Sequence, residues 1–371
     1  MNQDAGHQGS DPSLVDLGWD EEWEGSAAPW HGQGFVIGRV AAEDRGSYVV
    51  LTAGGERRAE VSGRYLYAAT APSDFPKVGD WAVLSTHDDS DADVIHAILR
   101  RRSWLSRKTP GEATEEQVLA ANIDVIFVVQ GLDHDFNLRR LERHLVMIHE
   151  GGARPAVVLN KADLQEDHEP FIGGVRSVSP GVEILTTSAV TGFGVDRLAK
   201  FIREGQTYAF IGSSGAGKSS LINRLLGRSH FRTEEVRGKD SRGRHTTARR
   251  ELVRIPGGGL LIDTPGIREF RLWDGEGGVD ETYAEIAALA AGCRYSDCTH
   301  SREAGCAVLR AVEEGHIPRP RYESYLKLRK ELAYLEARQK EKKAQRGRKK
   351  HKDIARAIKI FRKINPKGRF G

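Results

Sequence analysis

Hydrophobic and polar positions follow different patterns in successive parts of the chain. Between residues 34 and 107, short runs such as FVIGRV, SYVVLT and DWAVLST are separated by turn residues. Several short strands within about seventy residues are typical of a small β-barrel. We therefore predict an all-β barrel over residues 35–108.

From about residue 117 to residue 269, apolar runs alternate with amphipathic ones. The runs IDVIFVV, PAVVL, EILTTS, YAFIG and LLID have the continuous hydrophobicity of strands buried on both faces. The intervening segments LRRLERHLVMIHE and KSSLINRLLG have helical spacing. This alternation predicts an α/β domain, residues 109–280, in which helices cover both faces of a parallel sheet.

The pattern after residue 280 is helical and flanks a segment that contains all three cysteines. Tyr325, Leu328, Leu332 and Leu335 recur at heptad spacing. Two heptads are too few to predict a coiled coil, so we interpret these residues as the packed side of a helix. We assign residues 281–336 to a mainly helical domain.

Basic residues gather in two places. Residues 337–371 contain 15 Lys and Arg against two acids, a net +13, so the other residues carry −9 of the total +4. Such a tail predicts a polyanionic partner, or alternatively a solvated segment that only aids solubility. A second cluster suits either an oligonucleotide-binding face or a solvated barrel edge; it comprises Arg100, Arg101, Arg102, Arg107 and Lys108.

The N-terminal residues 1–34 are rich in Gly, Asp, Glu and Ser, and we expect an acidic, disordered extension with Trp19 and Trp23 in a short docking element at most. No run of about 18 apolar residues and no signal-peptide pattern is present. We therefore expect a cytoplasmic protein that contacts no membrane, and we expect it to be a monomer.

A phosphate-binding loop is indicated by 212-GSSGAGKSS-220, which follows the strand YAFIG and opens the helix KSSLINRLL. Backbone N–H groups at a helix N-terminus face phosphates, Lys218 reaches the β- and γ-phosphates, and the Ser219 hydroxyl ligates Mg²⁺. We predict that the nucleotide contacts Gly212, Ser213, Ser214, Gly215, Ala216, Gly217, Lys218, Ser219 and Ser220.

Guanine recognition is indicated by Asn160-Lys161-Ala162-Asp163. The Asp163 carboxylate can accept the N1–H and 2-amino groups of guanine, whereas adenine offers neither and leaves a buried acceptor unpaired. We expect Lys161 to lie along the base and Asn160 to tie its loop to the phosphate loop. In 187-TSAVTG-192, Ser188 and Ala189 can present backbone N–H groups to the guanine carbonyl.

The remaining elements of a GTPase follow the phosphate loop. In 263-DTPG-266, Asp263 is placed to hold Mg²⁺ through water and the Gly266 amide to sense the γ-phosphate. Residues 240–251 form a polar switch in which Thr246 or Thr247 completes the Mg²⁺ shell, and we select Thr247. Because the guanine motif precedes the phosphate loop, the sequence predicts a circularly permuted GTPase.

A metal site is indicated by Cys293-x4-Cys298-x-His300-x5-Cys306. Three thiolates and one imidazole form a closed tetrahedral set that suits one structural Zn²⁺ per chain. A small helical segment with few apolar residues gains folding energy from such a metal. The alternative is a set of free cysteines in a helical hairpin.

These motifs together resemble the RsgA-type (YjeQ-type) circularly permuted GTPases. The resemblance covers about residues 35–325. It implies an N-terminal OB barrel, the permuted GTPase, a zinc-binding C-terminal domain, and a role in late maturation of the small (30S) ribosomal subunit with binding of its 16S rRNA. With that partner, the basic tail becomes an RNA-binding segment. The motifs are GDWAVL, QVLAANIDVIFVV, DFNLRRLERHL, VVLNKADL, GSSGAGKSSLIN, GRHTT, DTPGIREF and CRYSDCTHSREAGCAV.

The catalytic group is not evident from the DTPG motif. Many GTPases carry a water-positioning Gln after this motif, whereas Ile267 and Arg268 follow it here. The resemblance suggests that His245 in the GRHTT switch supplies this function, with Lys218 and Thr247 as the other catalytic residues. The alternative is that His245 is a solvated loop residue and the partner supplies catalysis in trans.

The leading interpretation is an enzyme that hydrolyses GTP, with Mg²⁺, to GDP and phosphate and that the small subunit stimulates. A second interpretation is an RNA-binding assembly factor in which the nucleotide only stabilises the fold, although intact Lys218, Ser219 and Asp263 argue against it. A third, a phosphate-loop kinase or ATPase, leaves the NKAD motif without a purpose.

Overall fold

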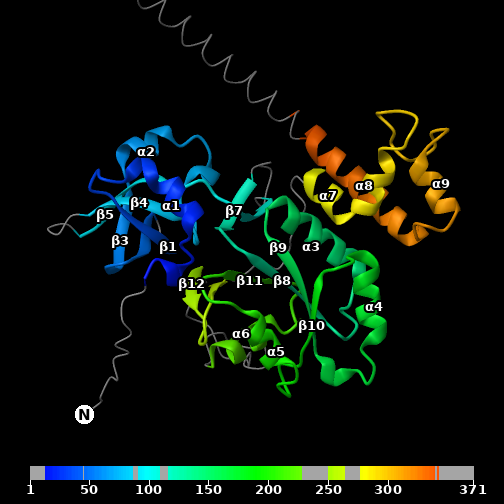
Figure 1. The fold of residues 1–371 in the computed structure, drawn as a ribbon, viewed down its shortest axis with the longest axis horizontal. Coiled ribbons are helices and arrows are strands. Elements are labelled where there is room, and N and C mark those ends of the chain that lie inside the picture. The colour runs from blue at the N-terminus through cyan, green and yellow to red at the C-terminus, as the bar shows by residue number, and fades with distance from the viewer. Residues whose placement is uncertain are drawn as a thin grey trace, which may run out of the picture.

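The computed structural model describes residues 13–44, 46–86, 91–108, 116–227, 250–263, 276–338 and 341. Within these ranges the barrel, the α/β region and a group of C-terminal helices lie in sequence order across the molecule (Figure 1). One sheet of eleven strands joins the first two, in the order β10-β9-β8-β11-β13-β12-β1-β2-β3-β5-β4. No helix among the described residues is long and apolar enough to cross a membrane.

The predicted barrel is confirmed. Strand β1 pairs with β2 on one side and with β4 on the other, which closes the sheet, and β3 pairs in parallel with β5. Tyr48, Val50 and Leu84 point into its interior among other buried apolar residues. The elements are β1 (Val36–Asp44), β2 (Ser47–Thr52), β3 (Gly55–Val61), α2 (Gly63–Ala68), η3 (Pro72–Asp74), β4 (Trp81–Ser85) and β5 (Asp93–Ile98).

The expectation of disorder at the N-terminus is wrong for residues 13–34, which form η1 (Val15–Leu17), α1 (Glu21–Ala27) and η2 (Ala28–Trp30). Aromatic packing orders them: the Trp19 ring lies 4.8 Å from that of Trp81 on β4, and Trp23 is 3% exposed. The composition does not indicate this, because the apolar surface that receives these rings belongs to the barrel.

Two residues of the basic cluster after β5, Arg101 and Arg102, have partners within the protein. Arg101 makes a two-bond ion pair with the buried Asp80. Arg102 pairs with Asp20, and its guanidinium lies 3.9 Å from the centre of the Trp23 ring. Arg102 thus holds the N-terminal segment, whereas Arg101 holds the loops of the barrel. A two-stranded ribbon follows, formed by β6 (Trp104–Lys108) and β7 (Glu116–Ala121), which was not predicted as a pair.

The central region has the predicted parallel sheet with helices on both faces. On β8, Ile126 and Val128 pack in the same cluster as residues of α3 and α4, while Phe127 and Val129 pack with residues of α5 and α6. The elements are β8 (Val125–Gly131), α3 (Leu138–Glu150), β9 (Arg154–Asn160), η4 (Ala162–Leu164), α4 (Glu169–Val178), β10 (Glu183–Thr186), α5 (Val195–Phe201), β11 (Thr207–Ile211), α6 (Lys218–Leu226) and β13 (Leu260–Asp263).

The end of the expected switch, residues 240–251, differs from the prediction. Glu251 begins the strand β12 (Glu251–Arg254), which pairs antiparallel with β13 and places Glu251 opposite Asp263. Glu251 also lies opposite Ala42 of β1, so β12 links the barrel to the parallel sheet. Residues 240–249 of this switch lie outside the described residues.

The C-terminal helices form their own apolar core around Tyr283, Tyr325, Leu328 and Leu332, as the heptad spacing of the last three predicted. They are α7 (Glu276–Thr282), α8 (Ala284–Ala290), α9 (Ala307–Glu313) and a helix over residues 319–338. Helix α7 lies against α3 (Figure 1). The approach requires glycine at Gly278, because a Cβ there would lie 2.1 Å from the carbonyl oxygen of Val146.

A buried ion pair fixes these helices to the α/β region. Arg321 donates from Nη1 to Glu142 on α3 over 2.7 Å and from Nε to Glu285 over 2.8 Å. The Arg321 and Glu142 side chains are each 4% exposed. The guanidinium also lies 3.9 Å from the ring centre of Tyr283. We call this group of residues the Arg321 joint.

Candidate nucleotide site and metal centre

The predicted nucleotide-binding motifs meet at one edge of the parallel sheet. Parallel strands end at the same edge, and here β9, β10, β11 and β13 end immediately before or within the motifs. We call the residues at this edge the nucleotide edge; it comprises 160–163, 187–192, 212–220 and Asp263. His245, Thr246, Thr247 and Gly266 lie outside the described residues.

The phosphate loop has the backbone that its glycines predict. Gly212 and Gly217 have φ of 144° and 92°, and a Cβ on Gly217 would lie 2.1 Å from Asn160 Nδ2. Helix α6 begins at Lys218, so its N-terminal N–H groups face the loop. The Lys218 ammonium donates to the carbonyl oxygens of Gly212 and Ser213 at 2.8 and 2.6 Å. The loop thus presents backbone donors and a cation, which suits phosphate binding.

Asn160 contacts both the phosphate loop and the loop 187–192, which we call the base-recognition loop. Its contact with the phosphate loop was predicted. Its Nδ2 donates to the carbonyl oxygen of Ala216 over 2.9 Å. Its Oδ1 accepts from the Ala189 N–H over 3.1 Å and from the Thr187 hydroxyl over 3.2 Å. Asn160 is 1% exposed, so protein groups supply these partners in place of water.

The loop that follows β10 differs in detail from the prediction. The Ser188 N–H donates to the carbonyl oxygen of Phe193, because the loop closes on itself, and so it is not turned toward a base. The Ser188 hydroxyl instead donates to the Asp163 carboxylate. The Ala189 N–H is held by Asn160 in this structure.

Lys161 has a partner that the sequence analysis missed. Its backbone has φ of 65°, and its ammonium lies 2.6 Å from Asp133 Oδ2. Burial acts to raise the pKa of Asp133, but hydrogen bonds from Lys161 and from the Asp135 N–H hold it below its usual range. Asp133 follows the apolar strand β8, and this position at the same sheet edge was the available signal.

Asp263 and Ser219 provide the chemistry that a Mg²⁺ site requires. Burial, and then the neighbouring Glu251 carboxylate, raise the pKa of Asp263 to about 7. A divalent cation favours the ionised form of such a carboxylate. The hydroxyl of Ser219, in the first turn of α6, is a second oxygen ligand of the kind that Mg²⁺ takes. The residues therefore fit this metal.

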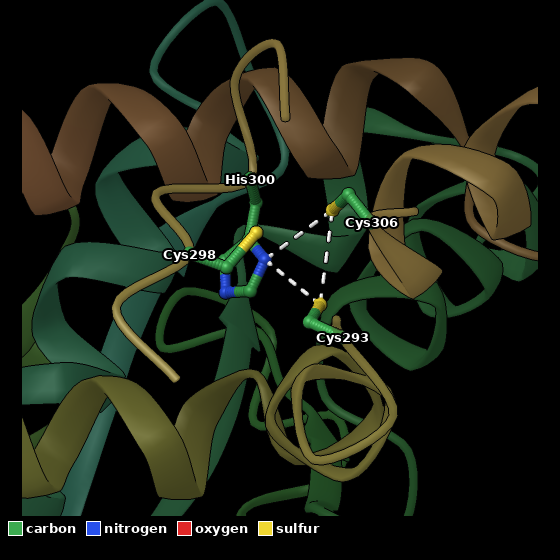
Figure 2. Close-up of side chains that lie close together, drawn as sticks. All are labelled: Cys293, Cys298, His300 and Cys306. Carbon is green, nitrogen blue, oxygen red and sulfur yellow. Dashed lines mark hydrogen bonds between the residues drawn. The ribbon is translucent and has the colours of Figure 1, made fainter. Parts of the chain in front are cut away.

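The four predicted zinc ligands are brought together (Figure 2). Their ligand atoms all lie within 4.8 Å of one another, and His300 Nδ1 lies 3.5 Å from the Sγ atoms of both Cys293 and Cys306. The two Sγ atoms are 3.8 Å apart. Tetrahedral Zn²⁺ with Cys and His ligands requires spacings of about 3.5 to 3.8 Å, so this Cys₃His set fits zinc. Cys298 completes it, and we call residues 293–306 the metal loop.

Two residues that the sequence analysis missed hold the metal loop in shape. The Glu303 carboxylate accepts hydrogen bonds from the N–H groups of Thr299, Ser301 and Arg302 at 2.8 to 3.0 Å. The Tyr322 hydroxyl donates to the carbonyl oxygen of His300 over 2.6 Å, where the backbone has φ of 59°. Such outer contacts orient metal ligands. An acid between two predicted ligands was the only sequence signal.

The fold and the site define a circularly permuted phosphate-loop GTPase. The phosphate-loop strand β11 lies in the sheet between β8 and β13, although it follows β8, β9 and β10 in the chain. The model of the RsgA GTPase family matches residues 98–273. The chain belongs to the RsgA GTPase family and is a GTP hydrolase.

Individual relatives extend the match beyond the GTPase region. The small ribosomal subunit biogenesis GTPase RsgA of Opitutus terrae is 45% identical over 335 residues, which cover 88% of this chain and 91% of that protein. A protein named RsgA 2 of Lactiplantibacillus plantarum is 46% identical over 310 residues, covering 83% and 87%. The crystal structure of YjeQ from Thermotoga maritima superposes with a TM-score of 0.60 at 26% identity, covering 81% of this chain and 99% of that one.

Proposed function

We propose that this GTPase acts in late maturation of the small ribosomal subunit, that the subunit stimulates its hydrolysis of GTP, and that it contacts 16S rRNA. The observation that carries the proposal is the match to relatives named small ribosomal subunit biogenesis GTPases along nearly their whole length. The net charge of +13 over residues 337–371 supports a polyanionic partner. The protein works as a cytoplasmic monomer.

The nucleotide edge binds GTP in this proposal. Asp163 reads the N1–H and 2-amino groups of guanine, Ala189 reads its carbonyl once the base is bound, and Lys161 lies along the ring. The loop residues 212–220 hold the phosphates. Gly266 senses the γ-phosphate.

Hydrolysis needs little covalent chemistry from the protein, because positioning and charge stabilisation supply most of the rate. Lys218 stabilises negative charge on the β- and γ-phosphates, and His245 orients the attacking water when the partner is bound. Ser219, Thr247 and, through water, Asp263 would hold Mg²⁺, which would neutralise charge on the phosphate oxygens. One Zn²⁺ held by the metal loop is structural.

The test is steady-state hydrolysis of GTP, with ATP as the control, in the presence and absence of purified small ribosomal subunits at moderate salt. We expect slow turnover of GTP that the subunits accelerate strongly, and no turnover of ATP. Turnover indifferent to subunits would reject the ribosomal partner. GTP binding without turnover in either condition would favour an assembly factor in which the nucleotide is structural.

A further inference from the structure

The base-recognition loop is held from outside by an arginine that belongs to none of the motifs. Arg224 lies on α6, which begins at Lys218. Its Nε donates to the carbonyl oxygen of Ala189 over 2.5 Å and its Nη2 to that of Val190 over 2.6 Å. One guanidinium thus donates hydrogen bonds to two consecutive carbonyl groups of the loop, a geometry that its planar arrangement of donors favours.

These contacts fix Ala189 from both sides. Its N–H donates to Asn160 Oδ1, and its carbonyl oxygen accepts from Arg224. The loop packs only in part, because Val190 and Phe193 are 77% and 56% exposed while Ala189 packs against the core cluster that includes residues of α6. The hydrogen bond that Ala189 donates to Asn160 and the one that it accepts from Arg224 therefore act together with this packing to position the Ala189 N–H.

An ordinary role for Arg224 as a helix-capping residue does not fit its contacts. Arginines near the end of a helix often hydrogen-bond to the last carbonyls of that helix. In α6 the N–H of Gly227 already caps the carbonyls of Asn223 and Arg224. The Arg224 side chain instead crosses to a loop 34 to 35 residues earlier in the chain.

We propose that Arg224 is a positioning residue that sets selectivity at the C6 position of the purine. It holds the loop so that, once the bound base replaces Asn160 Oδ1 as the acceptor, the Ala189 N–H meets a carbonyl oxygen at C6, which guanine has and which a 6-aminopurine lacks. Because Lys218 lies at the other end of the same helix, α6 fixes the position of the base-recognition loop relative to the phosphate loop. The inference rests on the proposed role of Ala189 in reading guanine.

The experiment compares the binding of three nucleotides to Arg224→Ala and to the wild type. The ribonucleoside triphosphate of 2,6-diaminopurine replaces the C6 carbonyl by an amino group and leaves N1 without a proton, whereas ITP keeps the carbonyl and the N1–H and lacks only the 2-amino group that Asp163 reads. The N1 contact with Asp163 is the same in wild type and variant, so a change in the preference between them reports the C6 contact. We expect the preference for GTP over the diaminopurine nucleotide to fall about tenfold, since two charge-assisted hydrogen bonds are lost. The preference for GTP over ITP should stay within about twofold of the wild type.

Two further variants make the outcome specific. Arg224→Lys keeps the charge but loses the planar fork that donates to both carbonyls from two different nitrogens. Its preference for GTP should therefore fall by a smaller factor, and this variant serves as the test if Arg224→Ala does not fold. Arg197→Ala on α5 removes an exposed arginine, paired with Glu183, as the matched control.

The inference is wrong if both Arg224 variants keep the wild-type preference for GTP over the diaminopurine nucleotide. It is also wrong if the preference for GTP over ITP falls by the same factor, or if Arg197→Ala has the same effect as Arg224→Ala. If the wild type itself does not prefer GTP over the diaminopurine nucleotide, the proposed reading of guanine fails, and the inference fails with it.

Discussion

The nucleotide edge and the metal loop are both irregular backbone, but different interactions hold them. At the nucleotide edge, hydrogen bonds such as that from Asn160 Nδ2 to Ala216 join segments far apart in the chain. In the metal loop the ligand atoms lie together, while Cys293 and Cys298 are only partly buried. Protein groups order the first region, whereas the second brings together three thiol groups and an imidazole, a set that a bound cation would stabilise.

The largest expected effect is the loss of one metal ligand. In Cys298→Ser the metal loop should lose much of its metal-binding free energy, which is on the order of 10 kcal/mol for a complete four-ligand site, and the C-terminal helices should become sensitive to proteases. The affinity for GTP should stay within about threefold, because the nucleotide edge keeps its own hydrogen bonds. Zinc content, limited proteolysis and GTP titration measure this, with Ser301→Ala as the matched control. Loss of GTP binding together with zinc would show that the nucleotide edge depends on the metal loop, contrary to this prediction.

The next largest effect concerns the Arg321 joint, which connects the C-terminal helices to α3 of the α/β region. Arg321→Met leaves the Glu142 carboxylate buried without its cation, which typically costs about 3 to 5 kcal/mol. Arg319→Met, two residues away, removes an exposed pair with Glu323 and should cost less than about 1 kcal/mol. Chemical denaturation of both variants checks the difference. Equal costs would mean that the joint does not couple the helices to α3.

The two regions also differ in what the sequence could predict. Asn160, Asp163 and Lys218 were predicted because nucleotide chemistry fixes residue types at short spacings. The contacts of Asp133 with Lys161 and of Arg224 with Ala189 were not, because such partners are 28 to 35 residues apart and no spacing rule connects them.

The same reasoning explains the corrections to the fold. The five barrel strands and the parallel strands have clear patterns within a few residues, and they were predicted. The N-terminal segment is ordered by Trp81 and Arg102, which come from the distant barrel and its following loop. Strand β12 is short and polar, and only its pairing with β1 and β13 defines it.

A smaller loss of folding stability is expected at low pH. Its expected source is a buried histidine of the α/β region, and not the metal loop. His144 on α3 is 7% exposed, and burial, followed by the charges of Arg140 and Lys218, lowers its pKa to about 4. Between pH 6.5 and 4 the unfolded chain therefore binds a proton that the folded chain does not, so stability falls as the pH falls. The loss is about 3 kcal/mol across this window.

His144→Gln should remove most of this pH dependence. Denaturation midpoints measured from pH 7 to pH 4 check it, with the exposed His316→Gln as the control. Acid also protonates the metal ligands. The comparison is therefore repeated in the Cys298→Ser background, where the difference between His144→Gln and its parent should persist. Its disappearance there would assign the acid sensitivity to the metal loop.

The smallest effect tests how far the metal loop is shaped before it binds metal. Glu303→Gln weakens the acceptor that three backbone N–H groups share, but it leaves all four ligands in place. Changes to such outer contacts typically cost about tenfold or more in metal affinity. Competition with a chromophoric chelator measures this, with the exposed Glu323→Gln as the control. Unchanged zinc affinity would mean that the cation alone shapes the loop, which would widen the contrast with the nucleotide edge.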